Sequence, residues 1–256
     1  MNLAHRLHGP ERAPVVVLSN SLGTPQFLWD GQLPELAKHF RVLTYDHPGH
    51  GLSELPEQPS TVEAFARGLL ALLDELGLER VSVCGVSLGG MVGMALALEA
   101  QERVERLVLA CTSAYLGPSE AWTERARVVR SEGIEAIADT VVARWFTPEL
   151  AREEPETVAR FRALLAATPP EGYARCCEAV GAWDARDRIS AISAPVLVVA
   201  GADDPATPVE HAELLVSRIP GARLHVLERA AHLANVERAE AFTSAVLEHL
   251  EQEVPV

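Results

Sequence analysis

The segment from residue 81 to residue 98 constrains the fold of this chain more than any other part. It reads VSVCGVSLGGMVGMALAL, carries no charge, and just reaches the length of a membrane-spanning helix. Glycines and serines interrupt it, and its residue types change from β-branched to Ala, Leu and Met. We therefore predict a buried strand over 81–85, a sharp turn, and a buried helix over 87–100.

The predicted turn carries the strongest chemical signal of the sequence, Gly85-Val86-Ser87-Leu88-Gly89. Its glycines permit a tight strand-to-helix turn that exposes the serine hydroxyl at the carboxyl edge of a sheet. The N-terminus of the following helix favours negative charge that develops nearby. A Gly-x-Ser-x-Gly pattern also occurs in structural turns, but its position between a strand and a helix predicts a nucleophilic serine.

Short apolar runs alternate with helical patterns through most of the chain. The predicted strands span 14–19, 41–45, 81–85, 104–110, 195–200 and 222–227. Residues 61–76 place apolar side chains on one helical face, and Gly77 ends that pattern. This alternation predicts an α/β fold with a mostly parallel central sheet and helices on both faces.

The alternation stops between about residues 115 and 187. Four helical patterns follow one another there, near 119–131, 134–145, 155–167 and 171–181. The strand pattern resumes at Pro195. We therefore expect residues 1–114 and 188–256 to form the core, and residues 115–187 to form a helical cap (lid) over one end of the sheet.

Charge and cysteine usage limit the partners of the chain. Its formal net charge is -14 at pH 7, which argues against the basic surface that nucleic acid or an anionic membrane requires. The first residues lack the apolar core of a signal peptide, and the four cysteines lack the spacing of a metal site. We expect a cytoplasmic protein that binds neither nucleic acid nor membrane. His47 and His50 have no third ligand near them in the sequence, so no metal is expected.

A nucleophilic serine needs a base to take its proton and an acid to orient that base. On a strand-turn-helix scaffold these residues follow one another in the order serine, acid, histidine. His232 is the predicted base, because its loop follows the last predicted strand and should lie beside Ser87. The acid should follow the strand at 195–200, where both Asp203 and Asp204 stand. The residues alone leave that choice open.

The negative charge that develops on the reacting carbonyl oxygen needs two backbone N–H donors. Leu88, directly after the serine, is expected to supply one of them. The loop after the strand at 14–19 is expected to supply the other, from Leu22 or alternatively from Gly23.

Two further motifs make the chain resemble the α/β-hydrolase family. The sequence DHPGHG at 46–51 is similar to the D-x-x-G-x-G turn of that family, and GADDPATP at 201–208 is similar to its G-x-x-D-x-x-x-P acid motif. The resemblance puts the acid at Asp204. It also implies a Ser87, Asp204 and His232 triad that needs no cofactor.

Within that family the chain most resembles the 3-oxoadipate enol-lactonases. The segments that carry the resemblance include SNSLGTPQFLWD at 19–30, ARWFTP at 143–148 and AAHLANVE at 230–237. Asn20-Ser21 stands where most α/β-hydrolases have His-Gly, a departure that the enol-lactonases share. The resemblance implies hydrolysis of 3-oxoadipate enol-lactone, a small lactone with a carboxylate arm, in the β-ketoadipate pathway of aromatic compound catabolism.

A small anionic substrate needs a local cation in so acidic a chain, and arginine pairs well with carboxylates. Arg144 is therefore the predicted contact for the carboxylate arm, and Trp145 the predicted apolar wall over the ring; a solvated charge and a core aromatic are the alternatives. A triad does not by itself select the bond that is broken. A carboxylesterase, a cofactor-free perhydrolase or a carbon–carbon bond hydrolase is thus an alternative enzyme, and a non-catalytic small-ligand binder is a less favoured one.

Overall fold

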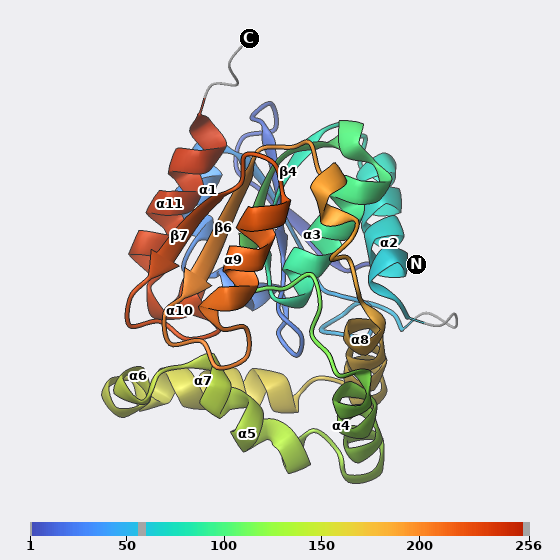
Figure 1. The fold of residues 1–256 in the computed structure, drawn as a ribbon, viewed down its shortest axis with the longest axis vertical. Coiled ribbons are helices and arrows are strands. Elements are labelled where there is room, and N and C mark those ends of the chain that lie inside the picture. Colours follow the sequence, from blue (N-terminus) through green and yellow to red (C-terminus); the bar gives the residue numbers. More distant parts are fainter. Residues whose placement is uncertain (1, 56–59, 253–256) are drawn as a thin grey trace.

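The computed structural model describes residues 2–55 and 60–252, and within these ranges seven strands form one sheet in the order β1-β3-β2-β4-β5-β6-β7 (Figure 1). The strands are β1 (His5–His8), β2 (Val15–Ser19), β3 (Arg41–Tyr45), β4 (Val81–Val86), β5 (Val104–Ala110), β6 (Val196–Gly201) and β7 (Arg223–Leu227). Strand β1 pairs antiparallel with β3, and the other pairs are parallel. Each of the six strands predicted from the sequence lies within one residue of its expected limits.

Helices cover both faces of the sheet, as the sequence predicts (Figure 1). On one face, α1 (Leu33–His39) and α11 (Ala239–Glu251) contact each other. On the other face lie α2 (Val62–Glu75), α3 (Leu88–Glu99) and α9 (Val209–Arg218). The predicted α/β-hydrolase fold class, with a mostly parallel sheet between two helical layers, is confirmed.

The uncharged segment at 81–98 is strand β4 followed by helix α3, as predicted. Helix α3 is apolar on all sides because strands β2, β4 and β5 cover one side of it and α2 covers another. Among the residues that the structure describes, no helix is both long enough and apolar enough to cross a membrane.

Helices lie at one end of the sheet in the connection between β5 and β6 (Figure 1). They are α4 (Ser119–Glu132), α5 (Glu135–Trp145), α6 (Pro148–Glu153), α7 (Pro155–Ala166) and α8 (Pro170–Ala182), and we call these five helices the cap. Four of them match the predicted helices. No helix was predicted over the residues of α6, so the structure corrects the sequence analysis there. This helix is too short to show a hydrophobic period, although Thr147 caps it by accepting a hydrogen bond from Leu150 N–H at 3.2 Å. The division of the chain at residues 115 and 187 stays a prediction.

The strand order places the carboxyl ends of β2 and β4 side by side. Strand β2 pairs with β3 on one side and with β4 on the other, so the order reverses at this point. In the register of β2 and β4, Ser19 lies opposite Gly85. Ligands of open α/β sheets bind at such a reversal, beyond the carboxyl ends of the strands.

Close backbone contacts at this point require two glycines. A Cβ atom at Gly89 would lie 2.0 Å from the carbonyl oxygen of Ser19, and one at Gly85 would lie 2.3 Å from the carbonyl oxygen of Gly89. Between them, Ser87 has φ 56° and ψ -117°, a conformation that residues with side chains rarely adopt. The strained serine is therefore held where α3 begins against the end of β2.

We expect Gly89→Ala to lower the free energy of unfolding by about 3 kcal/mol or more, because the added Cβ meets backbone that cannot yield. Gly31→Ala is the control, since its Cβ would meet only the Ala239 side chain, at 3.5 Å. Urea unfolding followed by circular dichroism measures both changes. A Gly89→Ala protein as stable as Gly31→Ala would contradict the close contact.

Candidate active site

The predicted nucleophile and the predicted base line one cavity beneath the cap. The residues around it come from the loops at the carboxyl ends of the strands and from the cap: Ser21, Leu22, Ser87, Leu116, Trp122, Arg125, Val141, Arg144, Trp145, Tyr173, Ala206, Thr207 and His232. Sheet edge and cap therefore enclose the site together. A mainly apolar cavity with a few converging polar groups is the usual form of a small-molecule site.

Asp204 holds the ring of His232. Its Oδ2 atom lies 2.8 Å from His232 Nδ1 and accepts a hydrogen bond from the Thr207 hydroxyl at 2.6 Å, while Oδ1 accepts from Ala206 N–H at 2.8 Å. Burial alone would raise the pKa of Asp204, but the charge and hydrogen bond of His232 and the bonds of Thr207 lower it to about 2. An ionised Asp204 keeps the proton of the neutral ring on Nδ1 and leaves Nε2 free to act as a base. Asp203, the alternative acid, is exposed.

Ser87 is fixed through its backbone. Its N–H donates to the carbonyl of Ala110 at 2.9 Å, and its carbonyl accepts from the Thr112 hydroxyl at 2.6 Å. Within the described part of the chain, Ser87 Oγ makes no hydrogen bond to His232. Contacts between a catalytic serine and histidine often tighten only when substrate is bound.

The hydrogen bonds of the loop after β2 distinguish Leu22 from Gly23, its two candidate oxyanion donors. Gly23 N–H donates to His50 Nε2 at 3.1 Å, so it is already engaged inside the protein. Leu22 lines the cavity, and Leu88 follows the serine at the start of α3. The geometry thus favours Leu22 over Gly23, and the oxyanion role of Leu22 and Leu88 stays a prediction.

Two neutral histidines hold this loop in place. His47 Nε2 lies 2.8 Å from the carbonyl of Asn20, and His50 Nδ1 lies 3.3 Å from that of Pro48. Because His50 Nε2 accepts from Gly23, its proton is on Nδ1. Burial lowers the pKa of His50 to about 4, and burial together with the nearby His50 lowers that of His47 to about 3. The ring nitrogens that the sequence analysis weighed as metal ligands therefore position the loop.

Glu237 ties the cap to the loop of the predicted base. Its buried carboxylate accepts hydrogen bonds from Ala231 N–H at 2.9 Å, from Thr147 N–H at 3.3 Å and from the Thr147 hydroxyl. On the other side of the predicted base, Leu233 N–H donates to the last carbonyl of α5 at 2.9 Å. Sequence reasoning missed this role, although an acid five residues after the predicted base was visible.

Two cap arginines reach the cavity. Arg144 of α5 lines it as expected, and so does Arg125 of α4, which sequence reasoning missed. All other arginines between residues 115 and 187 form ion pairs with carboxylates: Arg127, Arg130, Arg152, Arg160, Arg162, Arg175 and Arg186. Among the described residues, neither cavity arginine has an acidic partner. Some of these pairs are local, such as Arg127 with Glu124, but others join different elements, such as Arg130 with Glu171, and depend on packing that the sequence does not show.

Trp145, the predicted apolar wall, also lines the cavity. It is buried and packs edge-on against Phe161, with ring centres 6.5 Å apart. Its surroundings are compatible with both interpretations of the sequence, an apolar wall of the cavity and a core aromatic. One side of Trp145 contacts the core of the cap, and another side faces the cavity.

Comparison with known proteins assigns this arrangement to a family. A family model described as alpha/beta hydrolase fold matches residues 14–239. The chain belongs to the α/β-hydrolase family. The match spans both the sheet and the cap, and it includes all three residues of the predicted triad.

The relatives of this α/β-hydrolase include enol-lactonases. Two proteins of Acinetobacter baylyi are similar to it: 3-oxoadipate enol-lactonase 2 is 40% identical over 95% of this chain and 91% of its own, and 3-oxoadipate enol-lactonase 1 is 33% identical over 94% and 90%. The crystal structure of the enol-lactonase from Burkholderia xenovorans LB400 is 43% identical, with a TM-score of 0.95 over 98% of this chain and 96% of that one. The predicted similarity is confirmed, and the chain is a hydrolase.

We expect the free energy of unfolding to fall between about pH 6.5 and pH 4, because the unfolded chain protonates His50 in that range while the folded protein does not. A histidine whose pKa is lowered in the folded protein stabilises the fold least at low pH. The free energy of unfolding then falls by at most about 1.4 kcal/mol for each pH unit. Urea unfolding at pH 7 and pH 5 should show a smaller loss in His50→Gln than in the wild type. The same loss in both proteins would contradict a neutral His50.

Glu237→Gln should lower kcat about 10-fold on a soluble aryl ester, because the amide cannot accept all the hydrogen bonds that position the His232 loop. The lost bonds to a buried carboxylate should also lower the free energy of unfolding by about 1–3 kcal/mol. Glu240→Gln, on the exposed side of α11, is the control. If kcat falls equally in both variants, Glu237 has no positioning role.

Proposed function

We propose that this hydrolase converts 3-oxoadipate enol-lactone to 3-oxoadipate through an acyl-enzyme on Ser87, within the β-ketoadipate pathway. One observation carries the proposal: the cavity joins a serine and a carboxylate-bound histidine with two arginines that form no ion pair with a carboxylate of the described residues. A lactone with a carboxylate arm has a group for each feature. The names of its enol-lactonase relatives support the choice of lactone.

In the first step His232 Nε2 takes the proton of Ser87 as the serine oxygen attacks the lactone carbonyl carbon. The carbonyl electrons move onto oxygen, and the N–H groups of Leu22 and Leu88 stabilise that charge. Asp204 is ionised at neutral pH and stabilises the imidazolium ion that His232 has become.

Collapse of the tetrahedral intermediate breaks the bond between the carbonyl carbon and the ring oxygen. That oxygen leaves as an enolate, which departs more readily than an alkoxide, so this step depends less on proton donation than amide hydrolysis does. The imidazolium of His232 gives its proton to this enolate, which regenerates the neutral base, and the resulting enol remains part of the acyl group and tautomerises to the ketone. Water activated by His232 then attacks the acyl-enzyme, and the diacid product leaves with Ser87 restored.

The carboxylate arm fits the cap side of the cavity. The protein carries a formal net charge of -14, so its summed field opposes an approaching anion. Arg125 and Arg144 offset this field locally because no acidic side chain pairs with them in the described residues. Arg144 is proposed to contact the arm as the substrate enters the cavity, and Trp145 is proposed as the wall against the lactone ring.

Loss of the enol-lactone ultraviolet absorbance, with lactone generated in situ, tests the proposal. Wild type should turn the lactone over rapidly, Ser87→Ala should lose about 10⁴-fold or more in kcat, and Asp204→Asn should lose about 10³-fold or more. Asp203→Asn, the exposed neighbour, is the matched control and should stay within about 2-fold of wild type, as expected of surface substitutions.

Failure of the acyl-enzyme mechanism and failure of the lactone assignment give different results. Near-normal turnover by Ser87→Ala, or no labelling of Ser87 by a fluorophosphonate, contradicts the acyl-enzyme. Hydrolysis of simple aryl esters without turnover of the enol-lactone retains the serine mechanism and identifies a carboxylesterase instead.

A further inference from the structure

The hydroxyl group of Tyr173 is buried beside the cavity, and its O–H has no acceptor among the described residues. The side chain comes from α8 and is 0% exposed. A buried phenol normally finds an acceptor, because leaving its O–H unpaired costs free energy. A ligand atom that accepts a hydrogen bond in the cavity would supply the missing partner.

Arg125, on α4, lies next to this hydroxyl. Burial raises the pKa of the Tyr173 phenol, and the nearby guanidinium opposes that effect. The guanidinium stacks over the Trp122 ring, 4.7 Å from its centre, which restricts its orientation. Arg127, on the same helix, bonds instead to Glu124 at 2.7 Å.

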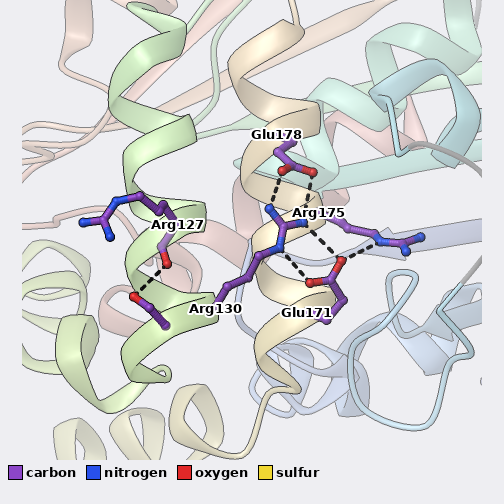
Figure 2. Close-up of polar contacts among 6 residues, drawn as sticks. Arg127, Arg130, Glu171, Arg175 and Glu178 are labelled. Carbon is purple, nitrogen blue, oxygen red and sulfur yellow. Dashed lines mark hydrogen bonds and ion pairs between the residues drawn. The ribbon is translucent and has the colours of Figure 1, made fainter.

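The two helices that carry this cation and this phenol are joined by an ion-pair network. Figure 2 shows Arg130 of α4 between Glu171 and Glu178 of α8, with Arg130 Nε 2.7 Å from a Glu171 oxygen. Because these side chains are partly exposed, the network adds little to overall stability. It links α4 to α8, the two helices that carry the cation and the phenol.

The two unpaired arginines differ in their surroundings. Arg125 is half-buried, whereas Arg144 of α5 is exposed. A charge pair is stronger where less water surrounds it, so Arg125 is the better anchor for an anion. An exposed cation at the cavity acts chiefly on the rate at which an anion arrives.

We propose that Arg125 and the Tyr173 hydroxyl together form the subsite for the carboxylate arm of the substrate, and that Arg144 guides the anion into the cavity. The inference rests on the proposed function and makes it more specific. The guanidinium donates two N–H groups to the carboxylate and the phenol donates its O–H, so the carboxylate is an acceptor for both side chains. The enzyme therefore selects lactones and esters with a carboxylate arm over neutral ones of the same shape.

Two lactones that share one ring test this selectivity. α-Angelica lactone has the five-membered enol-lactone ring with a methyl group where 3-oxoadipate enol-lactone has its carboxymethyl arm. In Arg125→Gln the ratio of kcat/KM for the carboxylate lactone to that for the neutral one should fall about 10- to 100-fold, mainly through KM, which is the effect of losing a charged hydrogen-bond pair. In Tyr173→Phe the ratio should fall about 5-fold.

Arg127→Gln is the matched control, because it removes one positive charge from the same helix outside the cavity. Its ratio should equal that of wild type. Arg125→Lys keeps the charge without the two-point geometry, and should lie between wild type and Arg125→Gln. This variant also guards against misfolding of Arg125→Gln, which urea unfolding would reveal.

An unchanged ratio in Arg125→Gln and Arg125→Lys overturns the subsite, and a larger fall in Arg144→Gln moves the anchor to α5. If wild type hydrolyses neither lactone, the proposed function has failed. The subsite is then tested on mono-4-nitrophenyl glutarate against 4-nitrophenyl pentanoate. A fall of that ratio in Arg125→Gln supports the carboxylate subsite, and a constant ratio overturns it.

Discussion

The approach of α3 to the end of β2 is the contact on which the rest of the site depends. The Ser19 carbonyl leaves no room for a side chain at Gly89, so the helix starts directly against the neighbouring strand. This closeness holds Ser87 in its strained conformation and brings the loop that carries Leu22 beside it. One backbone contact therefore sets both the nucleophile and the proposed oxyanion donors.

Hydrogen bonds of Glu237 join the cap to the loop that carries His232. Glu237 binds Thr147 of the cap and Ala231 of the loop that precedes His232. Hydrogen bonds within one buried cluster therefore connect the end of α5 to the loop of His232. They would couple the proposed substrate contacts of the cap to the position of the predicted base.

Electrostatic pairing explains how an acidic protein offers a site to an anion. The outer surface of the cap uses arginines in ion pairs that are largely solvated and contribute little energy. Within the part of the chain that the structure describes, the two cavity arginines form no such pair, and the buried phenol of Tyr173 has no acceptor for its O–H. The specificity that we propose follows from desolvation, because a neutral substrate would leave these donors unpaired.

Local pattern in the sequence was sufficient for the strands and most helices, because residue type and spacing decide a strand-turn-helix unit over short distances. It also predicted that Ser87 and His232 lie at one site, and both line the same cavity. It was insufficient where two neighbours competed. Asp204 contacts His232 because it is buried against that ring, whereas Asp203 is exposed. Gly23 is disfavoured as an oxyanion donor because its N–H already donates to His50, which lies 27 residues later in the sequence. Helix α6 was missed because a single capped turn has no hydrophobic period.

The sequence by itself determined the fold class and predicted the reacting serine and the base, since these depend on periodicity and on chain order. Only the tertiary structure decided which arginine and phenol side chains line the cavity beside them. Arg125 and Arg127 are alike in the sequence, and so are the three tyrosines. Arg127 pairs with Glu124 of its own helix, whereas Arg125 lines the cavity together with Tyr173 of α8. Which side chains meet there depends on packing between helices, and no local pattern encodes that packing.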